Sequence, residues 1–379
     1  MLTDQEQIND VGVRPCTILA LGFAKWWGSD CRALAQSFRR LGHNLIELDE
    51  EDYLPWRWEG LVPKASRRLL TPVWARNYND AVLRQASSSF YDFVLSFKGN
   101  HLTPDTIRSL TGFGKPIFNF YPDTNFVEYG KNIPAALSLY DCVFTTKTFH
   151  GEHDIRQFGI KDLQHVRHGF DPEVHRPITL TSKLRAHYSS DVSFVGCWSP
   201  ENEERILYIL TNRPNIKVRV YGLGWNHSSS EFKTRLGGNL GGGAFGDELA
   251  IVYCASTINL GLLRRAQSDP NIRDQTTVRT FQIPATKSLL LHEDTAEVRT
   301  FFEDGLEILL FRDNEEMIEK IELALRTPLL RESIREQGYQ RCMRVPYDYS
   351  SAARKVLSYF GSGSTPPVVE VDPLVAAAL

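Results

Sequence analysis

The 379-residue chain has no long hydrophobic run, no closely paired cysteines and no strong excess of charge. None of its apolar runs approaches the ~20 residues that a membrane span requires. The first residues, MLTDQEQIND, are too polar and acidic for a secretory signal peptide. A formal net charge of -3 gives no reason to expect duplex nucleic acid as a partner. We therefore expect a cytoplasmic protein without a transmembrane segment.

Neither the six cysteines nor the histidines form a metal-binding pattern. The cysteines are scattered without a C-x-x-C pair, and Cys142 and Cys254 are typical in lying inside apolar runs. This predicts reduced thiols in the core rather than disulfides or zinc ligands. His165, His168 and His175 lack the spacing of a helical metal site and are interpreted as part of a linker. No convincing D-x-D pair for a metal-bound diphosphate is present either, so we expect no metal.

Short apolar runs alternate with amphipathic helical patterns through the first half of the chain. Strands are predicted at 16–24, 44–50, 91–99, 115–123, 142–148 and 163–169, and helices at 31–43 and 103–110. Thr103 is the expected N-cap of the second helix. This alternation predicts a parallel sheet with helices on both faces. Residues 54–79 are aromatic and basic, break the rhythm and are interpreted as an insertion on the side of the ligand-binding cleft.

A second alternation follows a proline-containing boundary at 168–178. Strands are predicted at 191–196, 216–222 and 257–263, and helices at 200–212, 247–256, 315–326 and 329–344, with Asp247 as an N-cap. The segment Gly237–Gly246 lacks the Lys-Ser/Thr ending of a P-loop and is expected to be a mobile loop over the ligand site. Two such α/β units predict Rossmann-like domains at 1–170 and 171–348, facing each other across a central cleft, with a loose tail at 361–379.

Four segments of the second half occur in an order that resembles a known family. They are HGFDPEVHRP, DVSFVG with the helix that carries Arg205, STINLGLLRR…TTVRTFQIPAT…LLLHEDTAEV, and FEDGLEILLFRDNEEMIEKI. Together they resemble the CgeB-type glycosyltransferases, a GT-B-fold group related to the large glycosyltransferase family 4. SFKG and NFYPDTNF in the first half resemble it more loosely.

The resemblance implies metal-independent transfer of a sugar from a UDP- or GDP-type nucleotide-sugar, with no further cofactor. The first domain would bind the acceptor and the second the donor. A last helix at about 349–360 would cross back onto the first domain. The acceptor is left open among peptide, lipid, glycan and small molecule, as is retention or inversion at the anomeric carbon.

The resemblance also places the donor-binding residues. Without a metal, the charge on the leaving diphosphate is met by cationic side chains and helix N-termini. Arg264, Arg265 and Arg279 are the arginines in the matching segment, although the first two are equally well explained as solvated. The family usually has a glutamate at Gln282, and glutamine keeps the hydrogen bonding but loses the charge. The expected donor-binding set is Gly22, Gly196, Arg205, Tyr221, Gly222, Arg264, Arg265, Arg279, Thr280, Phe281 and Gln282.

The residues expected to be catalytic are Lys98, Asp123 and Gln282. Lys98 follows a predicted buried strand and would bind phosphate or acceptor hydroxyls, unless it is a strand-end lysine that reaches solvent. Asp123 follows another strand and would take the acceptor proton as a general base, unless it only begins a turn after Pro122. Tyr221 would pack against the nucleobase or simply end its strand.

Two other functions stay open. Because Gln282 replaces the usual glutamate, the chain is alternatively a degenerate GT-B protein that binds a nucleotide or sugar without turnover, as a partner subunit. A GT-B sugar-nucleotide epimerase fits less well, because the four segments match transferases better.

Overall fold

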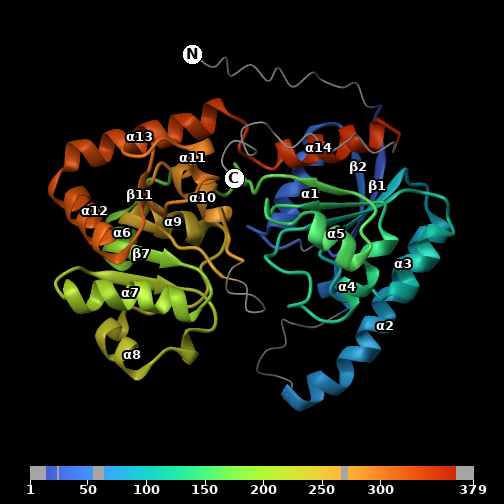
Figure 1. Cartoon of the computed structure of the whole chain (residues 1–379), viewed down its shortest axis with the longest axis horizontal. Coiled ribbons are helices and arrows are strands. Elements are labelled where there is room, and N and C mark those ends of the chain that lie inside the picture. Colours follow the sequence, from blue (N-terminus) through green and yellow to red (C-terminus); the bar gives the residue numbers. More distant parts are fainter. Residues whose placement is uncertain (1–13, 24, 54–63, 266–271, 364–379) are drawn as a thin grey trace.

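The computed structural model describes residues 14–23, 25–53, 64–265 and 272–363. Within these ranges the strands form two sheets, and every pairing is parallel. Figure 1 shows the two α/β units side by side. The predicted fold class, two parallel Rossmann-like α/β units, is confirmed. In the same ranges, no helix combines the length and apolar character needed to cross a bilayer.

The first sheet has the strand order β2-β1-β3-β4-β5-β6. Its strands are β1 (Thr17–Leu21), β2 (Asn44–Leu48), β3 (Phe93–Phe97), β4 (Ile117–Tyr121), β5 (Cys142–Thr145) and β6 (Leu163–His165). Side chains alternate between the faces of a strand. Ile18 and Ala20 therefore enter one core cluster, and Leu19 and Leu21 enter another on the opposite face.

Helices pack on both faces of this sheet (Figure 1). They are α1 (Asp30–Arg40), α2 (Lys64–Ser88), α3 (Pro104–Thr111), α4 (Asn132–Ala136) and α5 (Glu152–Phe158), with 3-10 turns at Glu50–Asp52 and Leu137–Leu139. The predicted N-cap is confirmed, because Thr103 Oγ1 accepts a hydrogen bond of 3.2 Å from the Thr106 amide.

The second sheet has the order β11-β10-β9-β7-β8. Its strands are β7 (Ser190–Val195), β8 (Val218–Tyr221), β9 (Ser256–Gly261), β10 (Leu290–Glu293) and β11 (Leu309–Phe311). Its helices are α6 (Ser182–Tyr188), α7 (Pro200–Asn212), α8 (Ser230–Leu236), α9 (Asp247–Ala255), α10 (Val278–Ala285), α11 (Val298–Phe301), α12 (Asn314–Arg326) and α13 (Pro328–Arg344), with 3-10 turns at Trp225–His227 and Gly237–Asn239.

The last described helix, α14 (Ser350–Gly361), packs on the first sheet rather than the second (Figure 1). Ala353 and Val356 join the core cluster that contains Ile18 and residues of α1. The Phe360 ring lies 4.7 Å from the Phe93 ring, measured between centroids. Helix α14, which follows the second unit along the chain, therefore packs against the first unit and links the two.

Two predictions about local structure are wrong. Much of the supposed insertion at 54–79 belongs to the long helix α2, while 54–63 lies outside the described residues. The helical pattern is hidden because Leu69 and Val73 are exposed, and a buried face begins only at Tyr78. Asp247 is the first residue of α9 and not its N-cap, a position that Gly246 occupies with a φ of 57°. Most of the predicted tail, 364–379, is also outside the described residues.

Candidate functional site

The carboxyl ends of β3 and β4 bring Lys98 and Asp123 together. Lys98 Nζ lies 2.8 Å from Asp123 Oδ2. The Lys98 backbone is left-handed, with a φ of 59°, a conformation that costs a non-glycine residue about 1–3 kcal/mol. It is held by a bond from its amide to the Phe120 carbonyl and by a bond from Asn119 Nδ2 to its own carbonyl, of 2.9 and 3.0 Å. Such strain persists only where the surroundings impose it, as they often do at functional sites.

Charges around this pair shift several pKa values. Burial alone would lower the pKa of Lys98, but the Asp123 carboxylate outweighs burial and raises it. Burial also raises the pKa of Glu50 to about 7, with a further contribution from the Asp49 charge. Burial raises the pKa of Asp30 to about 6, although a hydrogen bond from Tyr349 opposes the shift. The Lys98 charge acts on both carboxyl groups.

Glu50 and Asp30 were missed by the sequence reasoning. Glu50 follows β2 closely, in the same strand-end position that drew attention to Asp123, so its place in the chain was an available signal. Asp30 opens α1, where an acidic residue is explained by the helix dipole alone. Carboxyl groups that titrate near neutral pH are suited to accept a proton.

On the second sheet, Gly196 and Gly222 allow the ends of β7 and β8 to approach closely. A Cβ atom at Gly222 would lie 2.1 Å from the Gly196 carbonyl oxygen, so no side chain fits there. A Cβ atom at Gly196 would lie 3.0 Å from a guanidinium nitrogen of Arg279. The predicted residues Gly196, Gly222 and Arg279 are thus adjacent. Tyr221 is only 6% exposed, with its ring against Gly241 of the glycine-rich segment.

Arg279 lies in the first turn of α10 and reaches the ends of two strands. Its guanidinium donates to the Val195 and Leu262 carbonyls, at 3.3 and 2.7 Å, and lies over the Phe194 ring, 5.2 Å from its centroid. Burial lowers the pKa of this guanidinium, which nevertheless stays charged at neutral pH because arginine starts from such a high value.

Several buried polar atoms around α10 have no hydrogen-bond partner among the described residues. They include Thr277 Oγ1, at the N-cap of α10, and Arg279 Nε. His168 Nδ1, in the segment between the units, is another. Gln282 is 5% exposed one turn further along α10. Buried polar groups are nearly always paired in folded proteins, so these atoms are available to bond a ligand or water. Thr277 was not predicted from the sequence.

Some predicted donor-binding side chains are engaged elsewhere. Phe281 has no exposed surface and packs against Phe301 and Tyr347, with ring centroids 5.2 Å away in each case. Its contact with the donor stays a prediction. The Thr280 hydroxyl bonds His292 Nε2 at 2.9 Å and accepts from the Thr277 amide, and its role in donor binding likewise stays a prediction. Both residues face into the second unit, because α10 must bury one side against its own sheet.

The other arginines predicted to bind the donor contact residues of the protein itself. Arg264 reaches across to the first unit, with a nitrogen 3.7 Å from Glu128. Arg265 is exposed and pairs through its backbone with Arg273. Arg205 bonds Asn314 at 2.7 Å and Glu293 at 3.4 Å.

Gly22 belongs to the first unit, and not to the unit that carries Arg279. It turns the chain after β1 with a φ of 72°. A Cβ atom there would lie 2.9 Å from the Phe97 carbonyl oxygen.

Two loops also meet between the units. The Trp26 and Phe245 rings lie 5.3 Å apart, edge to face. A Cβ atom at Gly28 would approach the Gly246 amide nitrogen to 2.6 Å. The glycine-rich segment thus contacts the β1–α1 loop, so both loops border the same interface.

Comparison with known proteins gives a family match over part of the chain and a set of similar folds. Residues 202–358 match a family model described as glycosyl transferase-like. No curated protein matches. Sucrose-phosphate synthase from Thermosynechococcus elongatus has a similar structure, with a TM-score of 0.62 and 13% identity over 92% of this chain and 99% of that one. A glycosyltransferase from Rickettsia africae gives 0.60 and 12%, over 92% and 98%. HepE from Anabaena, in complex with UDP and glucose, gives 0.59 and 12%, over 92% and 100%.

The chain has the GT-B fold, and part of its second unit matches a glycosyl transferase-like family. The finer assignment to the CgeB type stays a prediction. The matched residues 202–358 run from α7 to α14 and include Arg279 and Gln282.

The histidines predicted to lie in a linker are separate in the structure. His165 Nε2 bonds the His150 carbonyl at 2.9 Å, and His175 Nδ1 accepts from the Asp171 amide at 2.9 Å. Within the described ranges, no group of three or more His, Cys, Asp or Glu residues could hold a metal ion.

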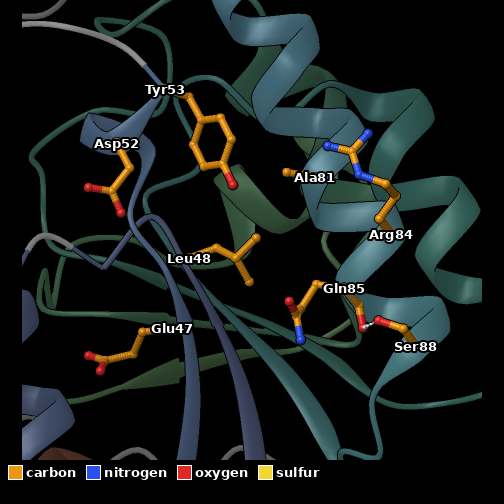
Figure 2. A pocket seen from close by; sticks show the side chains of 8 residues that line it. All are labelled: Glu47, Leu48, Asp52, Tyr53, Ala81, Arg84, Gln85 and Ser88. Carbon is orange, nitrogen blue, oxygen red and sulfur yellow. Dashed lines mark hydrogen bonds between the residues drawn. The ribbon is translucent and has the colours of Figure 1, made fainter.

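A hollow of about 290 Å³ lies between the end of β2 and helix α2. Figure 2 shows Tyr53 and Leu48 on one side of it and Arg84 and Gln85 of α2 on the other. None of the predicted catalytic or donor-binding residues lines it.

Proposed function

We propose that this protein is a glycosyltransferase that moves a sugar from a UDP- or GDP-type nucleotide-sugar to an acceptor hydroxyl without a bound metal. One observation carries the proposal. At the start of α10, beside Gly196, two buried atoms have no hydrogen-bond partner among the described residues: Thr277 Oγ1 and Arg279 Nε. A helix N-terminus with a buried arginine and a free hydroxyl suits a diphosphate. Residues 171–348 would form the donor domain, and 1–170 with 349–360 the acceptor domain.

The donor side would work by electrostatics. As the bond between the sugar and the diphosphate breaks, negative charge develops on the leaving phosphate. Arg279 would bind that phosphate with its planar fork and Thr277 with its hydroxyl, while Arg264 would approach from the other edge. Gln282 would hydrogen-bond hydroxyls of the sugar through its neutral amide. These cations would do what a metal does in other transferases, which is why no metal is proposed.

The acceptor side would work by proton transfer. Asp123 would take the proton of the acceptor hydroxyl as the hydroxyl oxygen attacks the sugar carbon, and Lys98 would orient the carboxylate through their ion pair. Glu50 and Asp30 are further carboxyl groups near Lys98 with raised pKa values. The acceptor is proposed only as a hydroxyl-bearing molecule.

Two observations support the proposed class of donor and the proposed cellular location. The HepE structures similar to this chain were obtained with UDP and with UDP-glucose, which favours a UDP-sugar for the first assays. All six cysteines are free thiols, which fits the proposed cytoplasmic location.

A second candidate function is binding without turnover. Gln282 in place of the usual glutamate is the observation that favours it, because a neutral amide stabilises developing positive charge less than a carboxylate does. Under this alternative the chain would hold a nucleotide-sugar and release no product.

Turnover of the donor separates the two. The protein is incubated with UDP-glucose, UDP-N-acetylglucosamine or GDP-mannose and a mixture of hydroxyl acceptors, in EDTA, and free UDP or GDP is measured by phosphorus NMR. We expect nucleotide release above the level of an Asp123→Asn control. Tight donor binding with no release from wild-type protein, and release only from Gln282→Glu, would favour binding without turnover.

A further inference from the structure

A buried ion pair joins the two units of the protein. Lys147 Nζ lies 2.6 Å from Asp274 Oδ1, and the two side chains are only 5% and 8% exposed. Lys147 follows β5 in the first unit, and Asp274 lies between β9 and α10 in the second. Replacing a buried ion pair by apolar residues is often neutral or stabilising, so overall stability alone does not explain such a pair.

The surroundings of this pair are polar and come from separate segments. Thr124, after β4, donates its hydroxyl to Asp274 Oδ1 at 3.2 Å. Lys147 Nζ lies 3.2 Å from His168 Nε2. The Thr146 hydroxyl lies 3.0 Å from the same His168 nitrogen. The pair is therefore oriented by bonds from both sides and is not a chance contact.

Asp274 also fixes the segment that carries the proposed donor cations. Its backbone amide donates to the Arg264 carbonyl at 2.9 Å, and Arg265 and Arg273 form an antiparallel bridge beside it. The backbone of Asp274 is thus bonded directly to that of Arg264. A few residues further on, Thr277 and Arg279 open α10. Moving Asp274 would displace Arg264 and the start of α10 relative to the first sheet.

We propose that Lys147 and Asp274 are positioning residues for sugar transfer. They touch no substrate, but they hold the donor cations of the second unit in register with Lys98 and Asp123 of the first. The part of this inference that concerns activity rests on the proposed function. The part that concerns the placement of the two units does not.

Three variants test the pair. Asp274→Asn leaves Lys147 buried without a counter-charge. The double variant Lys147→Met with Asp274→Leu removes both charges and leaves no unpaired group, so it decides the question if the single variant does not fold. The exchange Lys147→Asp with Asp274→Lys restores a pair of opposite charges. Glu152→Gln is the matched control, because it removes an exposed ion pair on α5, 3.4 Å long, within one unit.

Circular dichroism first establishes that each variant is folded. Small-angle X-ray scattering then measures the placement of the units without any substrate, and UDP release measures kcat and KM. We expect a larger radius of gyration for Asp274→Asn and for the apolar double variant. In the same two variants we expect kcat/KM to fall about 100-fold, mainly through kcat. This is the loss that a misplacement of the reacting groups by about 1 Å produces. The exchange variant should have a kcat/KM at least tenfold higher than that of Asp274→Asn. The kcat/KM of Glu152→Gln should stay within about twofold of the wild-type value.

The outcomes separate the two proposals. A folded apolar double variant with wild-type scattering and wild-type kcat/KM would overturn the positioning role. An absence of nucleotide release from the wild-type protein would overturn the proposed function instead, and the scattering comparison would still decide whether Lys147 and Asp274 hold the units together.

Discussion

Lys98 Nζ and Asp123 Oδ2 lie 2.8 Å apart at the ends of adjacent strands, with Lys98 held in a left-handed backbone conformation. The ammonium orients the Asp123 carboxylate, the group that we propose as the general base. The neighbouring Tyr129 ring, 5.2 Å from the Lys98 ammonium, completes the contact.

Asp123→Asn should therefore lower kcat for nucleotide release by about 10²–10⁴-fold, the range for losing a general base. Asparagine keeps the shape of the side chain, so KM for the nucleotide-sugar should change by less than about threefold. Steady-state kinetics at saturating acceptor measure both constants. An unchanged kcat would remove Asp123 from the mechanism and turn attention to Glu50 and Asp30.

Thr277→Val should weaken donor binding without weakening the fold. The Thr277 hydroxyl has no partner in the described part of the unliganded chain, so removing it sacrifices no internal hydrogen bond. A lost bond to a charged phosphate costs about 1.5–3 kcal/mol, or about 10–100-fold in affinity. Calorimetric titration with UDP gives Kd, and a melting curve gives stability. The control variant Thr277→Ser keeps the hydroxyl and should bind UDP like wild type. An unchanged Kd for UDP in Thr277→Val would place the diphosphate elsewhere.

Arg279→Lys separates the charge of this residue from its fork geometry. Lysine keeps the charge but cannot bind phosphate with two parallel bonds. It also loses part of the bonding to the Val195 and Leu262 carbonyls. We expect UDP affinity to fall at least tenfold, with a lower melting temperature. Arg312→Lys is the control, because Arg312 is an exposed arginine that pairs with Glu316, 2.9 Å away, and belongs to no predicted site. Equal UDP affinity in wild type and Arg279→Lys would contradict the proposed role.

Glu50 should make stability depend on pH. Its pKa is raised from an ordinary value of 4.5 to about 7 in the folded chain, chiefly by burial. The folded state therefore retains a proton that the unfolded state releases, and its contribution is complete below about 4.5 and lost as pH rises to about 7. Glu50→Gln should thus melt higher than wild type at pH 8, and the difference should shrink towards pH 4.5. Melting curves across this range check the trend, and parallel curves for the two proteins would refute it.

Local patterns were sufficient to predict most of the fold. The β3 and β4 strands are continuous apolar runs, as strands covered on both faces must be, and Thr103 carries the N-cap signal of α3. The start of α2 was not predictable from periodicity, because Leu69 and Val73 face solvent and no buried stripe exists there. The exact start of α9 depends on the positive φ of Gly246, which spacing does not reveal.

The candidate site was only partly predictable for a different reason. Lys98 and Asp123 could be paired from the sequence because parallel strands end at the same edge of a sheet. The contacts of Thr280 and Phe281 depend on which side of α10 faces its own sheet, and that is decided by partners such as His292 and Tyr347. The pairing of Lys147 with Asp274 joins residues of two units. No local pattern encodes such a distant contact.

Nucleotide binding to the whole chain is the first experiment to perform. Melting temperature is measured with UDP, GDP, ADP and their sugar conjugates, each with and without EDTA. A ligand present at 100 times its Kd adds about 2.7 kcal/mol of stability, enough to raise the melting temperature visibly. We expect a selective rise with one nucleotide and its sugar conjugate, unchanged by EDTA and reduced in Thr277→Val. No rise with any nucleotide, or a rise that EDTA abolishes, would contradict a metal-independent donor site at the start of α10.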